Sequence, residues 1–341
     1  MIELNELRDA AQKAFPAGAL IPDRNASWEL IAEMGWLMMR LCEDDGGLGL
    51  ARDASAAIHF ELGRVLSPAP LIPALMAIEA IAASGTLDGR EDWIERCCAG
   101  ELVTLNLSMG TVEQGEDGSL SGSLPAVPDA DMASHVLVCI KGLAVLVPTD
   151  AAGVAVSERA VWDRSRRLFD VTLDGHVPAP GLILAHGDKA HDIANRLRDE
   201  LLLALAADSL GGANAALDMT IDYLRMRKQF DRPLAMFQAL KHRVADLKAR
   251  IVSAEALLWK RGGDAAASTV DLGALKTLAA EVYEFVTEEM IQMHGGIGLT
   301  EEHQCHLFMK RAMLNLALGG MPDEWHEAAG RQALEDFAQS V

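Results

Sequence analysis

Apolar residues recur every three or four positions over most of this chain, which is the spacing of helices that bury one face. Within residues 1–98 the pattern is clear in SWELIAEMGWLMMRL (27–41) and SAAIHFELGRVL (55–66), and it is interrupted by the turn-forming stretches DDGGLGL and SPAPLIP. It returns near residue 190 and continues almost to the end. We therefore predict helical regions at both ends of the chain.

Two long helices are predicted in the C-terminal region. The first follows Pro233 and ends at Gly262-Gly263, with an apolar stripe of Leu240, Val244, Leu247, Ile251 and Leu258. The second ends at Gly295-Gly296, with a stripe of Leu275, Leu278, Val282, Phe285 and Met290. Because apolar residues cover more than one side of these helices, we expect a bundle that packs against another subunit.

The stretch between the helical regions has a different pattern. ELVTLNLSMG (101–110), HVLVCI (135–140) and LAVLVPT (143–149) are short and β-prone, with turn signals at GEDG (115–118) and TDAAG (149–153). We predict a helical N-terminal domain at 1–98, a small β-domain at 99–186 and a helical bundle at 187–341.

Composition narrows the class of protein. The chain has 341 residues, of which half are apolar, and its net charge is −20, from 30 basic and 50 acidic side chains. Such a negative charge argues against binding to nucleic acid or to a membrane surface. The five cysteines are odd in number, the N-terminus has no secretory signal, and no apolar run is long enough for membrane insertion. We therefore expect a soluble cytoplasmic protein.

Three stretches carry a family resemblance. They are CEDDGGLGLARDASAAIHFELGRVLSPAPLIP (42–73), YLRMRKQFDRPLAMFQALKHRVADL (223–247) and QMHGGIGLTEEHQCHLFMKRA (292–312). In this order and at these separations they resemble the acyl-CoA dehydrogenase family. The resemblance implies a mainly α fold with a helical N-terminal domain, a barrel-like central β-domain and a C-terminal four-helix bundle. It also implies FAD as cofactor and α,β-dehydrogenation of an acyl-CoA thioester, with a flavoprotein as electron acceptor.

The resemblance assigns cofactor contacts to two of these stretches. Arg227 matches the family arginine that reaches the FAD pyrophosphate, and a guanidinium fork suits phosphate oxygens. Phe230 and Gln238 match positions that contact the same cofactor. Gly295 and Gly296 match the place where the backbone closes on the ADP portion, with Gln292 as a further contact on that side. Taken singly, these residues could instead be a solvated helix end, a core phenylalanine and a helix C-cap.

A metal site is a separate alternative for the end of the third stretch. His294, Glu301, Glu302, His303, Cys305 and His306 include competent ligands. Consecutive residues of a helix point in different directions, however, so the run from His303 to His306 is not expected to converge on one ion. We predict no metal.

The chain departs from the family where the flavin ring is held. Ordinary members have a Thr-Glu-Pro…Gly-Ser-Asp loop and then a Trp/Tyr-x-Thr/Ser strand. Here the corresponding residues are LNLSMGTVEQGEDGSLSG (105–122) and SLPAVPDADMA (123–133), in which neither motif occurs. Much of the wall around the isoalloxazine is therefore expected to be missing.

The second departure concerns the carboxylate that removes the α-proton. By the family resemblance, Gly319 occupies the usual position of the catalytic glutamate, and Leu201 occupies an alternative position 26 residues before Arg227. Glu200 is one residue away, a rotation of about 100° on a helix, and Asp208 lies two turns further on. Both are weak candidates, and for Glu200 a solvated residue in the first turn of a helix is the competing interpretation.

Together these features suggest division of labour. In this family neighbouring subunits share each FAD, and some bacterial members that act on bulky, ring-bearing acyl-CoA thioesters consist of two different chains. We expect an acyl-CoA dehydrogenase subunit that assembles with a homologous subunit, as in a heterotetramer, or with itself. The alternatives are a non-catalytic partner that lends ADP-side contacts, and a homo-oligomeric enzyme with an unusual base or a different reaction such as hydration.

Overall fold

The computed structural model describes residues 3–108 and 110–340. Met109, in the loop that lacks the family motif, lies outside the described residues, as do residues 1, 2 and 341 of the predicted terminal domains. The chain forms two compact units. One comprises Met1–Pro22, Arg52–Ser67 and Leu202–Val341, and the other comprises Asp23–Ala51 and Pro68–Leu201.

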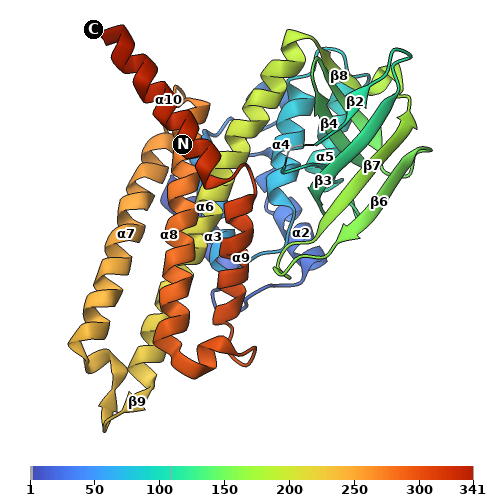
Figure 1. The fold of residues 1–341 in the computed structure, drawn as a ribbon. Helices are drawn as coiled ribbons and strands as arrows, with labels where there is room; N and C mark the ends of the chain where they lie inside the picture. Colours follow the sequence, from blue (N-terminus) through green and yellow to red (C-terminus); the bar gives the residue numbers. More distant parts are fainter. Residues whose placement is uncertain (1–2, 109, 341) are drawn as a thin grey trace. The chain divides into compact units, whose positions relative to one another are not determined.

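The first unit contains the helical bundle (Figure 1). Its helices are α6 (Asp188–Met226, from Leu202 onward), α7 (Gln238–Gly262), α8 (Thr269–His294), α9 (Cys305–Ala317) and α10 (Pro322–Ser340). Helix α8 begins with a capping box, in which Ser268 and Asp271 each accept a backbone N–H of the other, and it packs against α7, α9 and α10. These contacts place α8 at the centre of the bundle.

Two further helices complete this unit, α1 (Leu4–Ala14) and α3 (Arg52–Arg64). Glycines allow α3 to approach α6 closely: a Cβ on Gly63 would collide with the backbone of Asp208, and one on Gly211 would collide with the backbone of Phe60. Arg8 of α1 donates to the buried carboxylate of Glu61 on α3 at 2.7 Å. The unit is thus held by close helix packing and by a few specific polar bonds.

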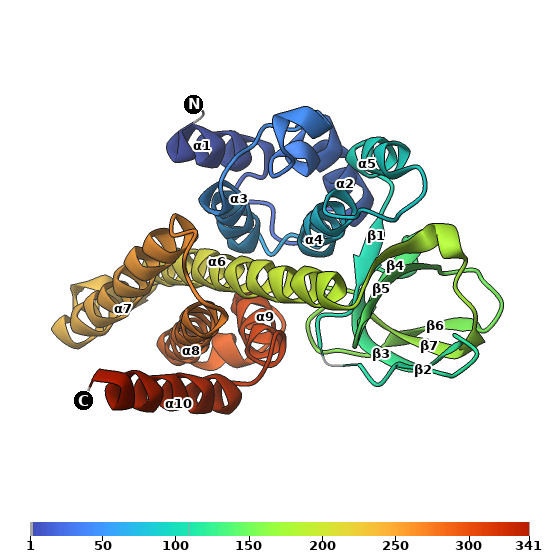
Figure 2. The ribbon, with the colours of Figure 1, turned by 90° about the horizontal axis from the view of Figure 1, so that it is seen from above.

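The second unit contains α2 (Arg24–Glu33), α4 (Leu71–Ala82) and α5 (Arg90–Cys98), followed by the β-domain. One sheet has the order β1 (Val103–Leu105), β4 (His135–Ile140), β5 (Leu143–Pro148), β8 (Ile183–His186), and the other has the order β2 (Glu113–Gln114), β3 (Leu120–Pro128), β7 (Leu168–His176), β6 (Val154–Arg159). The two sheets face each other (Figure 2). Leu124, Val138, Val145 and Val171 belong to the apolar core that they share.

The predicted fold class, helices followed by a small β-domain and then a helical bundle, is confirmed. The three domain boundaries remain a prediction. One detail of the apolar stripes is wrong: Leu278 is 38% exposed, whereas Leu275 and Met290 are buried. Positions 274, 278, 281 and 288 lie on the side of α8 that its neighbours leave partly or fully exposed, so Leu278 faces outward there.

Candidate cofactor site

The connection between α6 and α7 presents Arg227 and Phe230 at the surface. Strands β9 (Lys228–Gln229) and β10 (Arg232–Pro233) form a minimal hairpin, and both turn residues, Phe230 and Asp231, have positive φ angles of 53° and 60°. A two-residue hairpin turn of type I′ requires positive φ at both central residues, although this conformation is unfavourable for residues with a Cβ. Phe230 is 85% exposed.

Arg227 lies immediately after α6, and its side chain is exposed. Its backbone carbonyl accepts the N–H of Leu234, which ties the base of the hairpin together at 2.8 Å. Its guanidinium has no hydrogen-bond or ion-pair partner among the described residues. Five N–H donors are therefore available to a ligand from outside the chain.

The turn at the end of α8 is also open. Gly295 has φ 64° and ψ −142°, a conformation that essentially only glycine adopts, and a Cβ on Gly295 or Gly296 would meet no atom within 4 Å. Gly298, in the 3-10 helix η5 (Gly295–Leu299), differs because a Cβ there would lie 2.7 Å from the carbonyl oxygen of Ile291. Close packing thus explains why position 298 is a glycine, whereas the space around positions 295 and 296 is open.

The hairpin and the turn lie at the same end of the bundle (Figure 1). Tyr223, in the last turn of α6, stacks on His294 with ring centroids 4.2 Å apart, and its hydroxyl donates to the His294 carbonyl at 3.2 Å. The remaining predicted contacts, Gln238 at the start of α7 and Gln292 in the last turn of α8, are exposed as well. An unbonded guanidinium, two amides and two unobstructed glycines fit the phosphates and ribose of an ADP group.

The stretch predicted to lack the flavin-ring wall has an unusual backbone. Residues 123–133 contain Pro125 and Pro128, and the register between β3 and β7 shifts between Leu124 and Val127. Proline cannot donate a backbone hydrogen bond, which explains the irregularity at this point. Ala126 within the shift has φ 57°. No aromatic side chain occurs in this stretch.

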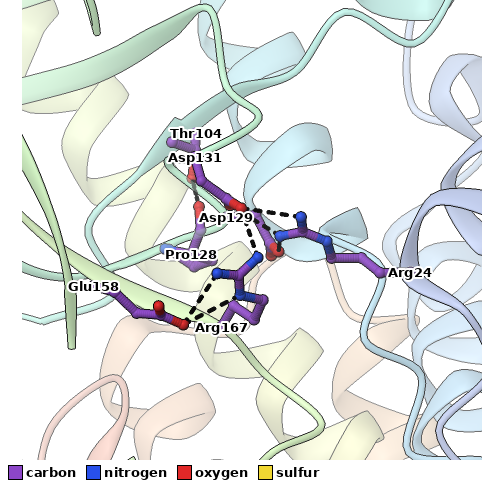
Figure 3. A network of polar contacts seen from close by, with 7 residues as sticks. All are labelled: Arg24, Thr104, Pro128, Asp129, Asp131, Glu158 and Arg167. Carbon is purple, nitrogen blue, oxygen red and sulfur yellow. Dashed lines mark hydrogen bonds and ion pairs between the residues drawn. The ribbon is translucent and has the colours of Figure 1, made fainter. Parts of the chain in front are cut away.

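The end of the same stretch takes part in a closed network of charges (Figure 3). Arg24 donates to Asp129 at 2.8 Å and to both oxygens of Asp131 at 2.9 and 3.0 Å. Arg167 bridges Asp131 at 2.7 Å and Glu158 at 3.0 Å. Burial raises the pKa of Asp129 to about 6, although Arg24 acts in the opposite direction. These polar groups bond to one another within the chain.

Glu200 lies deep in α6, and its carboxylate is bonded to an arginine. The helix begins at Asp188, and Glu200 is buried, so the interpretation of a solvated first-turn residue is wrong. Arg40 Nη2 donates to Glu200 at 3.3 Å, while its Nε donates to Glu79 at 2.8 Å and its Nη1 donates to the carbonyl of Leu50 at 2.9 Å. The catalytic role of Glu200 remains a prediction.

Asp208 is buried in a more extensive set of bonds. Arg311 of α9 donates to both carboxylate oxygens, at 2.9 and 3.1 Å, and Asn315 Nδ2 donates at 2.7 Å. Arg311 also donates to the carbonyl of Ser67 at 3.0 Å. An arginine fork stabilises the ionised form of a carboxylate and makes it a weaker proton acceptor. The role of Asp208 as a base likewise remains a prediction.

Gly319, at the position where the resemblance places the glutamate, belongs to the turn between α9 and α10. It has φ 70°, and its carbonyl accepts the indole N–H of Trp325 at 3.0 Å. The buried Lys276 donates to the carbonyls of Leu316 and Gly320, both at 2.8 Å, and burial lowers its pKa to about 8. The turn therefore offers backbone and no carboxylate at position 319.

The potential metal ligands near the third motif do not assemble. Among the described residues no group of three or more histidine, cysteine or carboxylate side chains could hold an ion. His294 and His303 pack ring against ring at 4.5 Å, and Cys305 Sγ points to the Gly298 carbonyl. Throughout the residues that the structure describes, no helix is both long enough and apolar enough to cross a bilayer.

Sequence comparison identifies the family. Models of the acyl-CoA dehydrogenase N-terminal and C-terminal domains match residues 4–101 and 200–330. Acyl-CoA dehydrogenase IpdE2 of Mycolicibacterium smegmatis is 30% identical over 298 residues, which are 87% of this chain and 84% of that protein. The chain belongs to the acyl-CoA dehydrogenase family. FAD is the cofactor of the family, and two solved members are described as complexes with FADH2 and with FAD.

Solved structures agree with this assignment. A variant described as the Tcur3481–Tcur3483 steroid ACAD shares 28% identity, with a TM-score of 0.84 over 98% of each chain. The ChsE4–ChsE5 complex of Mycobacterium tuberculosis has a TM-score of 0.85 over 98% of each chain at 23% identity, which shows the common fold.

Reasoning from sequence missed the residues that bond to the candidate carboxylates. Arg40 and Arg311 were not singled out, because partners separated by 160 and 103 positions cannot be paired from one sequence. Lys276 was missed for a related reason, since a lysine in a helix is normally solvated. The indication that the sequence offers is that Lys276 directly follows Leu275, a residue of the predicted apolar stripe.

Proposed function

We propose that this chain is the supporting subunit of a hetero-oligomeric acyl-CoA dehydrogenase. In this proposal it contributes the contacts to the ADP portion of an FAD, whose flavin ring is held by a homologous subunit. One contrast carries the proposal. The polar side chains at the ADP-side positions, Arg227, Gln238 and Gln292, are exposed and have no hydrogen-bond or ion-pair partner among the described residues, whereas Asp129 and Asp131 in the ring-side stretch are bonded to Arg24.

FAD supplies the two-electron acceptor for removal of hydrogen across the Cα–Cβ bond, and the protein supplies binding and orientation. Arg227 would pair with the pyrophosphate oxygens, the amides of Gln238 and Gln292 would bond to the ADP portion, and Gly295 and Gly296 would let the backbone approach it. The α-proton would be removed by a carboxylate of the homologous subunit, because position 319 has none and the two other candidates, Glu200 and Asp208, are bonded to arginines.

For the substrate we propose a bulky, ring-bearing acyl-CoA thioester. Support comes from the relatives: one is described as a steroid ACAD, and another solved relative is described as a complex of two chains. A flavoprotein that accepts electrons completes the proposed set of partners.

The decisive experiment is expression of this chain alone and together with a homologous acyl-CoA dehydrogenase chain. The chain alone should be colourless, and the co-purified complex should be yellow, with about one FAD for each pair of chains by absorbance. Single-turnover bleaching by a CoA thioester should occur only in the complex. If the chain alone retains FAD and turns over substrate, it is a self-sufficient homo-oligomeric enzyme and the proposal is wrong.

A further inference from the structure

Three aromatic side chains pack together beside the candidate cofactor turn. Tyr223 stacks on His294 at 4.2 Å with an interplanar angle of 25°, His294 contacts His303 at 4.5 Å, and Tyr223 meets the edge of His303 at 5.9 Å. They come from the end of α6, the end of α8 and the segment between η5 and α9. We refer to Tyr223, His294 and His303 as the Tyr–His stack. It joins the two segments that carry Arg227 and Gly295.

Hydrogen bonds assign a proton to each imidazole. His294 Nδ1 lies 2.7 Å from the carbonyl oxygen of Met290, which can only accept, so Nδ1 carries the hydrogen. His303 Nδ1 accepts the backbone N–H of Cys305 at 3.2 Å, so the hydrogen of His303 is on Nε2. His294 Nε2 is buried and has no hydrogen-bond partner among the described residues. Both rings are thus neutral in this arrangement.

A second proton on either ring would be poorly accommodated. On His294 it would occupy the buried Nε2, and on His303 it would face the N–H of Cys305. The groups around the stack are the phenol of Tyr223 on α6, the Met290 carbonyl on α8, and the backbone of Cys305 on α9. The neighbouring Glu301 is exposed and lies 3.6 Å from Lys310, and among the described residues no carboxylate is a cause of the pKa shift of either ring.

The direction of the pH dependence follows from this environment. Burial lowers the pKa of His294, an effect that the Met290 carbonyl opposes and the charge of His303 reinforces, and burial also lowers the pKa of His303. The unfolded chain, in which histidine titrates near pH 6.5, therefore binds these protons more tightly than the folded chain. The stack stabilises the turn fully above about pH 6.5 and progressively less as the pH falls below it.

We propose that Tyr223, His294 and His303 are positioning residues that hold the Gly295–Thr300 segment in the shape that receives the ADP portion of FAD, and that acidification opens this segment and releases the cofactor. The part of this inference that concerns FAD binding and release rests on the proposed function. The stack does not touch the ligand itself: it acts through Gly295 and Gly296, which follow His294 directly in the sequence, and through the Tyr223 hydroxyl that bonds to the His294 carbonyl.

The first test needs no cofactor. Amide hydrogen exchange of residues 291–305 in the full chain should become severalfold faster between pH 7.5 and 5.5, beyond the intrinsic pH effect, because protonation of the buried imidazoles favours the open segment. His303→Gln keeps an acceptor for the Cys305 N–H and should retain the pH 7.5 protection with a smaller pH response. His303→Leu should lose protection at both pH values, and His191→Gln, at an exposed histidine of α6, should behave like the parent chain.

The second test uses the assembled complex and follows FAD retention by ultrafiltration. Retention should fall severalfold from pH 7.5 to 5.5 in the parent, and by less than about twofold when both His294 and His303 are replaced by glutamine. Exchange of residues 291–305 that does not respond to pH, or FAD retention that does not follow the exchange, would overturn the inference. A complex without FAD at pH 7.5 would instead overturn the proposed function, and the exchange result would still stand.

Discussion

The end of the bundle that carries Arg227 and Gly295 and the end of strand β3 both correspond to places where the family resemblance predicts contacts with FAD, yet they are built in opposite ways. At the bundle end, Arg227 has no partner within the described residues and Gly295 faces open space. At the end of β3, Asp129 is buried and bonded to Arg24, and Asp131 is held between two arginines. Polar groups that a chain leaves unbonded at its surface, such as Arg227, are available to a ligand. Groups that bond to each other, such as Arg24 and Asp129, maintain the fold.

The largest effect on stability is expected at the buried ion pair of Asp208 and Arg311, whose polar groups bond to each other within the chain. Arg311→Ala would leave a buried carboxylate without its fork, and breaking such a pair costs about 3–5 kcal/mol of unfolding free energy. Denaturant unfolding measures this. Arg331→Ala, at an exposed pair with Glu327, is the matched control and should cost less than about 0.5 kcal/mol. Equal effects of the two variants would show that the pair is not desolvated.

Arg227→Ala tests the open end. A charge-assisted contact with phosphate contributes about 1.5–3 kcal/mol, so FAD affinity of the assembled complex should fall about ten- to a hundredfold. The free energy of unfolding of the chain should hardly change, because the side chain has no internal partner. Arg225→Ala is the control, since Arg225 lies two residues earlier, is exposed and pairs with Asp222. Unchanged FAD content in Arg227→Ala would remove the basis of the comparison.

Arg24→Gln gives the opposite pattern in the closed region. Loss of the Arg24 bonds leaves Asp129 buried with fewer donors, which should cost about 1–3 kcal/mol at pH 7.5 and leave FAD content unchanged. Burial already raises the pKa of Asp129 to about 6. Because a carboxyl with a raised pKa binds its proton more tightly in the folded state, acidification from pH 7.5 to 5 should reduce the cost of the substitution.

Arg159→Gln, at a half-exposed pair in the same β-domain, provides the control and should cost less than about 1 kcal/mol without the pH trend. A loss of FAD from Arg24→Gln that matches the loss from Arg227→Ala would mean that the end of β3 also supports the cofactor. The distinction between the two regions would then disappear.

The sequence was sufficient for features that depend on local pattern. Helices α7 and α8 end at the glycine pairs that were expected to end them, and the hairpin and turn of the two C-terminal motifs lie at the surface. Features that depend on distant partners were not predictable. Nothing local indicates that Asp208 meets Arg311 or that Lys276 reaches the carbonyls of Leu316 and Gly320, because such bonds follow from helix packing.

The smallest effect is expected for Glu200→Gln, which tests whether this chain carries its own base. Glutamine keeps an acceptor oxygen for Arg40, so the surrounding bonds to Glu79 and Leu50 should persist. If the base belongs to a homologous subunit, turnover of the assembled, FAD-loaded complex should stay within about threefold of the parent, well under 1 kcal/mol in the barrier at about 1.36 kcal/mol per decade. Loss of a true general base should cost about a hundredfold or more.

Asp208→Asn should likewise leave turnover within about threefold of the parent when equal amounts of folded complex are compared, although its stability will be lower. A rate that collapses in either variant while FAD remains bound would place the catalytic carboxylate in this chain, and the supporting-subunit proposal would be wrong.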